Sequence, residues 1–278
     1  MYPIILCHGV CRFDILWKEA LQVDNSDDPK VDDKHYFKGI RTMLKKNGFD
    51  VFHTNVPWGA SVKDRAGVLK KQIMKILQGP PQYEKVHIIA HSMGGLDARH
   101  MMFDDRNDGR IHDRIASLTT ISTPHEGSPF ADWGTEHLSR IIETAKLIGL
   151  DLNAMKDLRT DSCRAFNDNP DVIKFEKQLS QKATLQTYAG HQDWSSTFWP
   201  LKFSHHIITD AEGINDGLVS VKSARWRATD SHHELAKTDH LNELGWWDVA
   251  QAFAGEFSSQ LLSRIHGLYL EIAQNVSG

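Results

Sequence analysis

VHIIAHSMGG, residues 86–95, is the stretch that decides the fold of this 278-residue chain. Its first half, 86–90, is almost entirely apolar, which is typical of a strand buried on both faces of a parallel sheet. A helical pattern follows over 96–103. Ser92 therefore stands on a sharp turn between a strand and a helix, where small neighbouring residues leave room for the strained backbone of a nucleophile elbow.

The elbow lies within a longer alternation of strand-like and helical segments. Short strand-like runs occur at 4–6, 49–56 and 115–121. Helical patterns cover 36–47 and 61–77, and in the second of these the apolar residues recur at intervals of three and four. This alternation predicts an α/β fold with a mostly parallel central sheet that is flanked by helices.

The alternation stops after Pro124. Residues 128–180 are mostly helical in pattern and contain no convincing strand, which predicts a helical lid or cap inserted into the fold. Because the chain has no repeats and no low-complexity segment, we expect a single domain, 1–278, that carries this insertion. The other expected elements are a surface loop at 24–34, strands at 184–189 and 218–221, and helices at 241–252 and 256–273.

Composition excludes several classes of protein. Hydrophobic residues make up 40% of the chain and charged residues 24%, which is ordinary globular usage and excludes disordered and fibrous proteins. Lys and Arg total 32 against 36 Asp and Glu, for a net charge of −4. No overall basic field therefore exists to hold nucleic acid. No apolar run reaches the roughly 18 to 20 residues of a membrane span, so no transmembrane segment is expected.

The N-terminus shows no secretory signal. Met1 is followed by a strand-like segment without a basic region, an apolar core or a cleavage site. As written, the chain is expected in the cytoplasm, and a secreted or exported form is left open. The three cysteines (Cys7, Cys11 and Cys163) have no metal-type spacing and are expected to be buried thiols.

A serine on an elbow needs a base and an orienting acid, and in folds of this kind they follow in the order Ser, Asp or Glu, His. Downstream of Ser92, an Asp-Gly turn carries Asp216, and His240 precedes the next helical pattern. Each of these two residues alone would be an ordinary turn or a helix start, but together they stand in the expected order. Asp193, which follows the strand-like run 184–189, is the alternative acid.

Backbone amides complete the predicted site. The Met93 amide opens the helix after the elbow, where the helix dipole favours negative charge. A His-Gly turn ends the first strand, and the backbone of Val10 just after it can supply a second donor to the same oxyanion. We therefore predict an oxyanion hole formed by Val10 and Met93.

Five ordered motifs resemble one family. They are PIILCHGV at 3–10, AHSMGG at 90–95, STPHEGS at 122–128, NDGLV at 215–219 and DHL at 239–241. Together they resemble the bacterial triacylglycerol lipases of the α/β-hydrolase fold, most of all the Pseudomonas, Burkholderia and Proteus type. The resemblance implies an α/β-hydrolase fold, Ser92 as nucleophile, Asp216 as acid, His240 as base, and a helical lid over an acyl-binding cleft.

The chain departs from this family at several positions. Ala90 replaces the first glycine of the elbow pattern. The family holds calcium with an aspartate two residues after the histidine and offers a glutamine four residues further on, and these positions are Asn242 and Trp246 here. Calcium prefers several oxygen ligands that include carboxylates. We therefore expect no metal and no cofactor, although Asp193 and Asp239 could contribute to a calcium site.

A dense aromatic stretch lies between the expected lid and the predicted acid. Trp194, Phe198 and Trp199 are candidates for substrate binding, while core filling is the alternative for each of them. The resulting hypothesis is hydrolysis of carboxylic esters of lipid-like substrates through an acyl-enzyme, with transient contact to a lipid interface. The alternatives are an acyltransferase that uses the same three residues and a catalytically silent protein that binds lipid or a partner.

Overall fold

A six-stranded sheet forms the centre of the computed structural model, which describes residues 1–10, 25–137, 152–249, 252 and 255–278. The strand order is β2-β1-β3-β4-β5-β6, and every neighbouring pair is parallel. The α/β class predicted from the sequence is thereby confirmed. The strands are β1 (Ile4–Cys7), β2 (Val51–His53), β3 (Val86–His91), β4 (Ile115–Ile121), β5 (Thr184–His191) and β6 (His232–Ala236).

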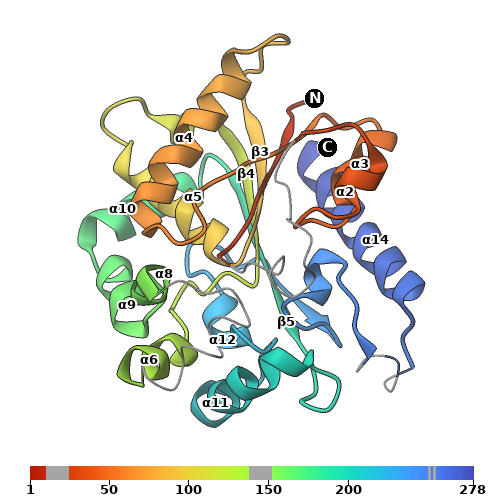
Figure 1. Ribbon diagram of the computed structural model, residues 1–278. Coiled ribbons are helices and arrows are strands. Elements are labelled where there is room, and N and C mark those ends of the chain that lie inside the picture. Colours follow the sequence, from red (N-terminus) through yellow and green to blue (C-terminus); the bar gives the residue numbers. More distant parts are fainter. Residues whose placement is uncertain (11–24, 138–151, 250–251, 253–254) are drawn as a thin grey trace.

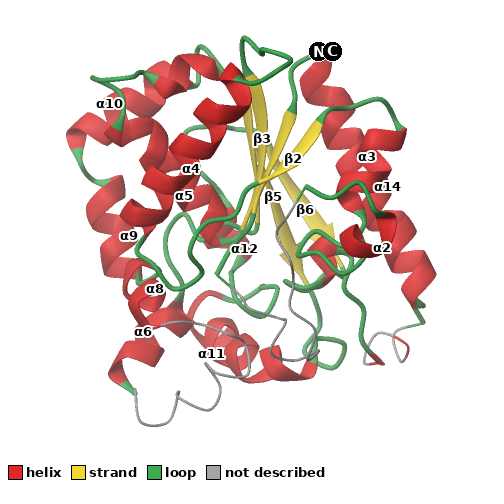
Figure 2. Cartoon of the chain, turned by 45° about the horizontal axis from the view of Figure 1, so that its top comes forward, coloured by secondary structure: helices red, strands yellow, loops and turns green. Residues whose placement is uncertain are grey.

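Helices cover both faces of the sheet (Figures 1 and 2). On one face lie α3 (Ile40–Lys46) and α14 (Ser258–Ser277), and on the other lie α4 (Val62–Gln78), α5 (Met93–Asp104) and α10 (Pro170–Leu179). The period-two alternation of a strand explains how one sequence can supply both cores. In β1, Ile4 and Leu6 join the apolar cluster under α3 and α14, whereas Ile5 and Cys7 join the cluster under α4 and α5.

Helix α4 forms where its apolar stripe and its start signal predict it. Ser61 caps the helix, because its side chain accepts a hydrogen bond from the Asp64 amide. The stripe is buried at Val62, Ala66, Leu69, Ile73 and Leu77.

The insertion after β4 divides into two parts. Helix α10 packs Val172, Phe175 and Leu179 into the same apolar cluster as α4 and α5, so it is a crossover helix between β4 and β5. Helices α6 (Pro129–Glu136), α8 (Leu152–Asp157) and α9 (Thr160–Asn167) instead lie beyond the carboxyl ends of the strands (Figure 1). The middle of the expected lid, 138–151, lies outside the described residues.

The strand expected at 218–221 is wrong. Asn215 and Ser220 close a tight turn there by an isolated bridge, and the chain continues as the short helix α12 (Val221–Ala224). A turn forms here although the composition favours a strand, because the Asp216 side chain accepts hydrogen bonds from the amides of residues 218 and 219. The sixth strand, β6, was missed, since it is an edge strand with mostly exposed side chains and no apolar pattern.

Several boundaries also differ from the expectation. The 24–34 loop contains a short helix, α2 (Pro29–Asp32), that Asp28 caps. The helix expected at 36–47 begins only at Ile40, after Gly39 at φ 66°. In the first part of the helix expected at 241–252 the chain forms a 3₁₀ turn, η3 (Asn242–Leu244), which ends at Gly245 with φ 86°, and residues 250–251 lie outside the described residues. The remaining elements are η1 (Ile111–Arg114), η2 (Trp199–Leu201) and α11 (Lys202–Glu212).

Among the described helices, none combines the length and the apolar character needed to cross a membrane.

Candidate active site

Ser92 has the strained backbone that the elbow motif predicts. It lies between β3 and α5 with φ 57° and ψ −133°, a conformation that L residues rarely adopt. Gly94 is required because a Cβ atom there would lie 2.6 Å from the Cys7 carbonyl oxygen at the end of β1. Ala90, which replaces the usual elbow glycine, is fully buried at 0% exposure. The elbow therefore forms with alanine in that position.

Asp216 and His240 meet at the same edge of the sheet. The Asp216 Oδ2 atom lies 2.7 Å from His240 Nδ1, and both side chains are fully buried. Asp216 Oδ1 accepts the amides of Leu218 and Val219 at 2.8 and 2.7 Å. Burial alone would raise the pKa of Asp216, but the neighbouring His240 and these amides hold it below its ordinary value.

The second ring nitrogen of His240 is available for chemistry. Its Nε2 atom is buried and has no hydrogen-bond partner within the described part of the chain, Ser92 Oγ included. The His240 ring lies beside the ring of His91, the residue before Ser92, with centroids 4.4 Å apart. Contacts between a nucleophile and its base are often loose without substrate. The structure therefore brings Asp216 and His240 together next to the elbow without a Ser92–His240 hydrogen bond.

The loop after β1 approaches Ser92 closely. A Cβ atom on Gly9 would lie 2.7 Å from Ser92 Cβ and 3.0 Å from Ser92 Oγ, so only glycine fits there. The Gly9 amide donates to the Tyr36 hydroxyl at 3.1 Å. Val10 follows directly and lines the same cavity as Ser92. The two predicted oxyanion donors, on Val10 and Met93, thus stand on two segments that meet at the serine.

The cavity beside Ser92 is small and apolar. Its volume is about 30 Å³, far below the roughly 300 Å³ at which ligand pockets begin. The sequence predicted roles for Val10 and Ser92 but for none of the other lining residues, although four of them stand in the motifs at 122–128 and 215–219. These other residues come from the loop after β4, from α6 and α8, and from the 218–219 turn. They are Pro124, Ser128, Phe130, Ala131, Met155, Leu158, Leu218 and Val219.

A buried hydrogen-bond network behind the elbow was not predicted. The Tyr36 hydroxyl lies 2.7 Å from His91 Nδ1, and His91 Nε2 lies 2.8 Å from Glu243 Oε2. Ser122 donates to the other carboxyl oxygen of Glu243 at 2.5 Å. Burial, and then the charge of nearby Asp216, raise the pKa of Glu243 well above its ordinary value. His91 and Ser122 stand within the sequence motifs but had no predicted role, and Tyr36 and Glu243 stand in none of these motifs.

The aromatic candidates lie away from the cavity. Trp194 and Trp199 are 55% and 59% exposed. Phe198 is buried, and its amide donates to Asp239 Oδ2 at 2.9 Å, so it supports the loop that carries His240. The described lining of the Ser92 cavity includes none of the three. Asp193, the alternative acid, is exposed in the loop after β5.

The family's calcium position is occupied by internal hydrogen bonds in this chain. Asn242 Oδ1 accepts the Asp239 amide at 3.0 Å, and Asn242 Nδ2 donates to the Trp246 carbonyl at 2.9 Å. Asp239 accepts three backbone amides, and burial raises its pKa to about 7. These contacts brace the loop that carries His240.

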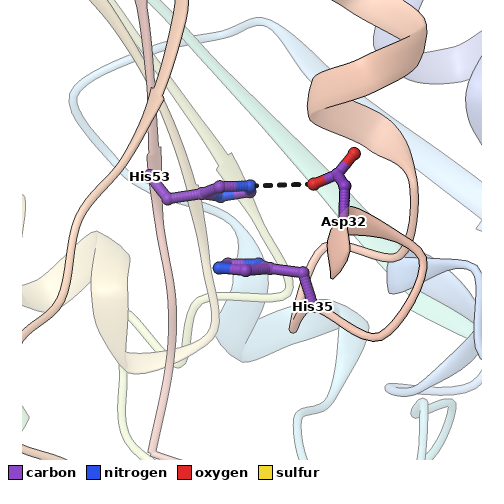
Figure 3. Close-up of side chains that lie close together, drawn as sticks. All are labelled: Asp32, His35 and His53. Atoms are coloured by element: carbon purple, nitrogen blue, oxygen red, sulfur yellow. Dashed lines mark hydrogen bonds and ion pairs between the residues drawn. The ribbon is translucent and has the colours of Figure 1, made fainter. Parts of the chain in front are cut away.

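Two buried groups in the described residues have ligand-type atoms within 4.8 Å of one another. One is His91, His240 and Glu243, and the other is Asp32, His35 and His53. Figure 3 shows that the rings of His35 and His53 lie face to face, with centroids 3.5 Å apart and planes at 20°. A nitrogen lone pair lies in the plane of its ring, so these two rings cannot both point at one ion as they are placed.

Comparison with known proteins adds a family to this geometry. Residues 50–189 match the model of the PGAP1-like alpha/beta domain. Triacylglycerol lipase 2 of Saccharomyces cerevisiae is 30% identical over 288 residues, which cover 90% of this chain and 82% of the yeast protein. A triacylglycerol lipase of Pseudomonas fragi is 31% identical over 131 residues, covering 47% of this chain and 37% of that protein. The similarity therefore extends to triacylglycerol lipases broadly and does not single out the Pseudomonas type.

A solved structure shares the fold. The crystal structure of a metagenomic carboxyl esterase aligns with a TM-score of 0.70 at 16% identity, covering 99% of this chain and 75% of that one. At this low identity the likeness shows the α/β-hydrolase fold and not the substrate.

Proposed function

Since the chain belongs to the family of triacylglycerol lipases with a PGAP1-like alpha/beta hydrolase domain, it is a carboxylic ester hydrolase, and we propose that it cleaves lipid-like esters through an acyl-enzyme on Ser92. The observation that carries the proposal is the pairing of Asp216 with His240 Nδ1 beside the elbow, which leaves His240 Nε2 without a partner among the described residues.

The proposed reaction has two halves. Ser92 Oγ attacks the ester carbonyl carbon, and its proton passes to His240 Nε2. The oxyanion of the tetrahedral intermediate accepts hydrogen bonds from the Val10 and Met93 amides. When the carbon–oxygen bond breaks, His240 returns the proton to the leaving alcohol. Water then attacks the acyl-enzyme with His240 as base, which releases the acid and restores Ser92.

Asp216 fixes the state of His240 in this mechanism. Its carboxylate accepts the Nδ1 proton, so the lone pair of the neutral ring stands on Nε2. When His240 takes the serine proton, the ionised Asp216 stabilises the imidazolium. The lowered pKa of Asp216 keeps the carboxylate charged at neutral pH.

The apolar lining of the cavity supports an acyl chain as its occupant. Phe130 on α6 and Met155 on α8 line the cavity, which is too small for an acyl chain, so we propose that these helices move apart to admit one. We therefore assign the lid role to the helices α6, α8 and α9, which lie beyond the strand ends, and not to α10. The exposed rings of Trp194 and Trp199 are suited to transient contact with a lipid interface.

Hydrolysis of p-nitrophenyl esters of increasing chain length tests the proposal. Ser92→Ala should lower kcat by about 10⁴-fold or more on every ester, while thermal unfolding stays close to that of the unmodified protein. The unmodified protein should prefer chains long enough to fill an apolar cleft. Retention of most of the activity by Ser92→Ala would remove the assignment of the nucleophile.

A further inference from the structure

A fully buried arginine lies next to the predicted oxyanion loop. Arg65, in the first turn of α4, is 0% exposed, and Asp97 on α5 is 1% exposed. Arg65 Nε lies 3.0 and 2.9 Å from the two Asp97 oxygens, and Arg65 Nη2 lies 2.7 Å from Oδ2. Burial of two charges is costly, and an apolar pair would often pack two helices equally well. The ion pair therefore calls for a reason beyond helix packing.

The rest of the guanidinium group holds the loop after β1. Arg65 Nη2 donates to the His8 carbonyl at 2.9 Å and to the Gly9 carbonyl at 3.3 Å, and Nη1 donates to the Pro57 carbonyl at 3.1 Å. The guanidinium group is planar and rigid, and Asp97 holds one of its edges. The remaining N–H donors of Arg65 therefore point in a fixed direction.

The Gly9 carbonyl and the Val10 amide belong to one peptide unit. In the described residues the only cis peptide is Pro80–Pro81, so this unit is trans, and its C=O and N–H point in opposite directions. Arg65 and the His8 ring hold the carbonyl side, with Arg65 Nη2 3.3 Å and His8 Nδ1 2.8 Å from the Gly9 oxygen, and Arg65 also holds the preceding carbonyl, that of His8, at 2.9 Å. Tyr36 accepts the preceding amide, that of Gly9, at 3.1 Å. Together these contacts fix the rotation of the peptide unit and with it the direction of the Val10 N–H.

We propose that Arg65 is a positioning residue that orients the Val10 N–H toward the developing oxyanion. We further propose that Asp97, by pairing with Arg65, fixes this orientation relative to the elbow. Asp97 belongs to α5, the helix whose first residue, Met93, supplies the second predicted donor. The ion pair therefore links the two segments that carry the two donors. This inference rests on the proposed function, since it assumes an oxyanion between Val10 and Met93.

The size of the expected effect follows from known oxyanion holes. Removal of one hydrogen-bond donor lowers kcat by about 10²–10³-fold, and a displacement of a catalytic group by about 1 Å lowers it by up to about 10²-fold. Loss of the Arg65 contacts misdirects the Val10 donor without deleting it. The effect should appear in kcat, because the oxyanion exists only in the transition state and the intermediate.

Arg65→Lys is the test variant, because lysine keeps the positive charge but lacks the planar guanidinium group with its several N–H donors. Asp97→Asn is the second variant and serves where Arg65→Lys does not fold. Arg99→Lys is the matched control: Arg99 stands on the same α5, is 2% exposed, and pairs with Glu176 at 2.6 Å without a described contact to His8 or Gly9. Three quantities are measured, namely kcat and KM on one p-nitrophenyl ester, the Tm, and the affinity for an alkyl trifluoromethyl ketone.

The ketone adds the readout that a purely structural role would not move, since its adduct with Ser92 carries an oxyanion. Arg65→Lys should lower kcat by about 10- to 100-fold with KM within threefold, and it should weaken ketone binding by a similar factor. Asp97→Asn should act in the same direction with a smaller effect. Arg99→Lys should lower the Tm comparably and leave kcat and ketone binding within threefold.

Two results would overturn the inference. One is a kcat within threefold of the unmodified protein for Arg65→Lys or, if that variant does not fold, for Asp97→Asn. The other is a loss of kcat in Arg99→Lys as large as that in the Arg65 variant. Failure of the proposed function is recognised separately, because Ser92→Ala would then remain active whatever the Arg65 variants do.

Discussion

Two buried groups in this protein contain the same types of residue and differ in what they can do. Asp32, His35 and His53 form one group, and Glu243, His91 and His240 form the other; each has two imidazoles and one carboxylate. All six side chains are buried. Residue type and burial therefore do not distinguish the two groups, and the difference lies in the residues that surround them.

The first group lies between the edge strand β2 and the helices beside it (Figure 3). His53 Nε2 lies 3.1 Å from Asp32 Oδ1, and the other Asp32 oxygen accepts the Thr42 amide at 2.7 Å. The His35 ring stacks on His53, and burial lowers the pKa of His35 to about 2. These contacts join α2 and α3 to the edge strand β2, so the group stabilises the fold.

The second group stands at the carboxyl end of β3, beside the strained serine. His91 uses both of its nitrogens, on Tyr36 and Glu243. His240 uses only Nδ1, on Asp216, and the described residues leave its Nε2 without a partner. A histidine becomes a candidate base when one nitrogen is held and the other is left for a nucleophile. His35 in the first group also has a buried Nε2 without a partner in the described residues, so an unused nitrogen alone does not mark the base. His240 differs because the buried Asp216 carboxylate holds its Nδ1 next to the strained serine.

The largest expected effect separates the two groups directly. His240→Gln should lower kcat on a p-nitrophenyl ester by about 10⁴- to 10⁶-fold, because the variant lacks the base that we assign to Ser92. His53→Gln is the matched variant in the other group, and its kcat should stay within threefold while its Tm falls. Equal losses of activity in the two variants would contradict the distinction between the groups.

The next effect concerns the acid. Asp216→Asn should lower kcat by about 10²- to 10⁴-fold, because an amide neither fixes the Nδ1–H tautomer of His240 nor stabilises the imidazolium. Asp193→Asn alters the exposed alternative acid in the loop after β5 and should leave kcat within twofold. Steady-state kinetics at pH 8 measures both variants. A larger loss for Asp193→Asn would transfer the acid role to Asp193.

A smaller effect concerns stability, and it arises in the group of Asp32, His35 and His53. The pKa of His35 is 6.5 when unfolded and about 2 when folded, so below pH 6.5 the unfolded chain binds a proton that the folded chain does not. His35 therefore favours unfolding as the pH falls from 6.5, by about 1.4 kcal/mol for each pH unit. His35→Phe should lose less stability than the unmodified protein between pH 6.5 and pH 5 in urea titrations. Parallel curves would show that His35 is already protonated in the folded state.

The last prediction is that removal of metal ions changes neither kcat nor the Tm. We propose that catalysis needs no metal, because the stacked rings of His35 and His53 cannot face one ion and Asn242 is engaged with Asp239 and Trp246. Dialysis against EDTA should leave kcat and the Tm unchanged. Loss of activity that either calcium or zinc restores would show that one of these groups, or the His240 loop, holds an ion.

The sequence predicted the parts of the protein whose structure is local. The strand 86–91 and the elbow at Ser92 follow from an apolar run and small residues, and α4 follows from its Ser61 cap and its apolar stripe. The strand expected at 218–221 failed because the side chain of Asp216 turns the chain at that point. Strand β6 was missed because an exposed edge strand has no apolar pattern.

The residues behind the site could not be predicted for a different reason. Glu243 meets His91 across 152 positions of the sequence, and Arg65 reaches the His8 carbonyl across 57. No periodicity or spacing reports such contacts, because they depend on how separate helices pack on the sheet. Ser92, Asp216 and His240 could be proposed from the sequence only because the order of these three residues is itself a pattern.

The most direct test of the account is the mass of the acyl-enzyme. The protein is mixed with a long-chain p-nitrophenyl ester and quenched in acid within one turnover, and its peptides are then weighed. The account predicts that the acyl group is attached to the peptide containing Ser92, that it accumulates in the first turnover, and that it is absent from Ser92→Ala. An acyl group on another residue, or full turnover by Ser92→Ala, would contradict it.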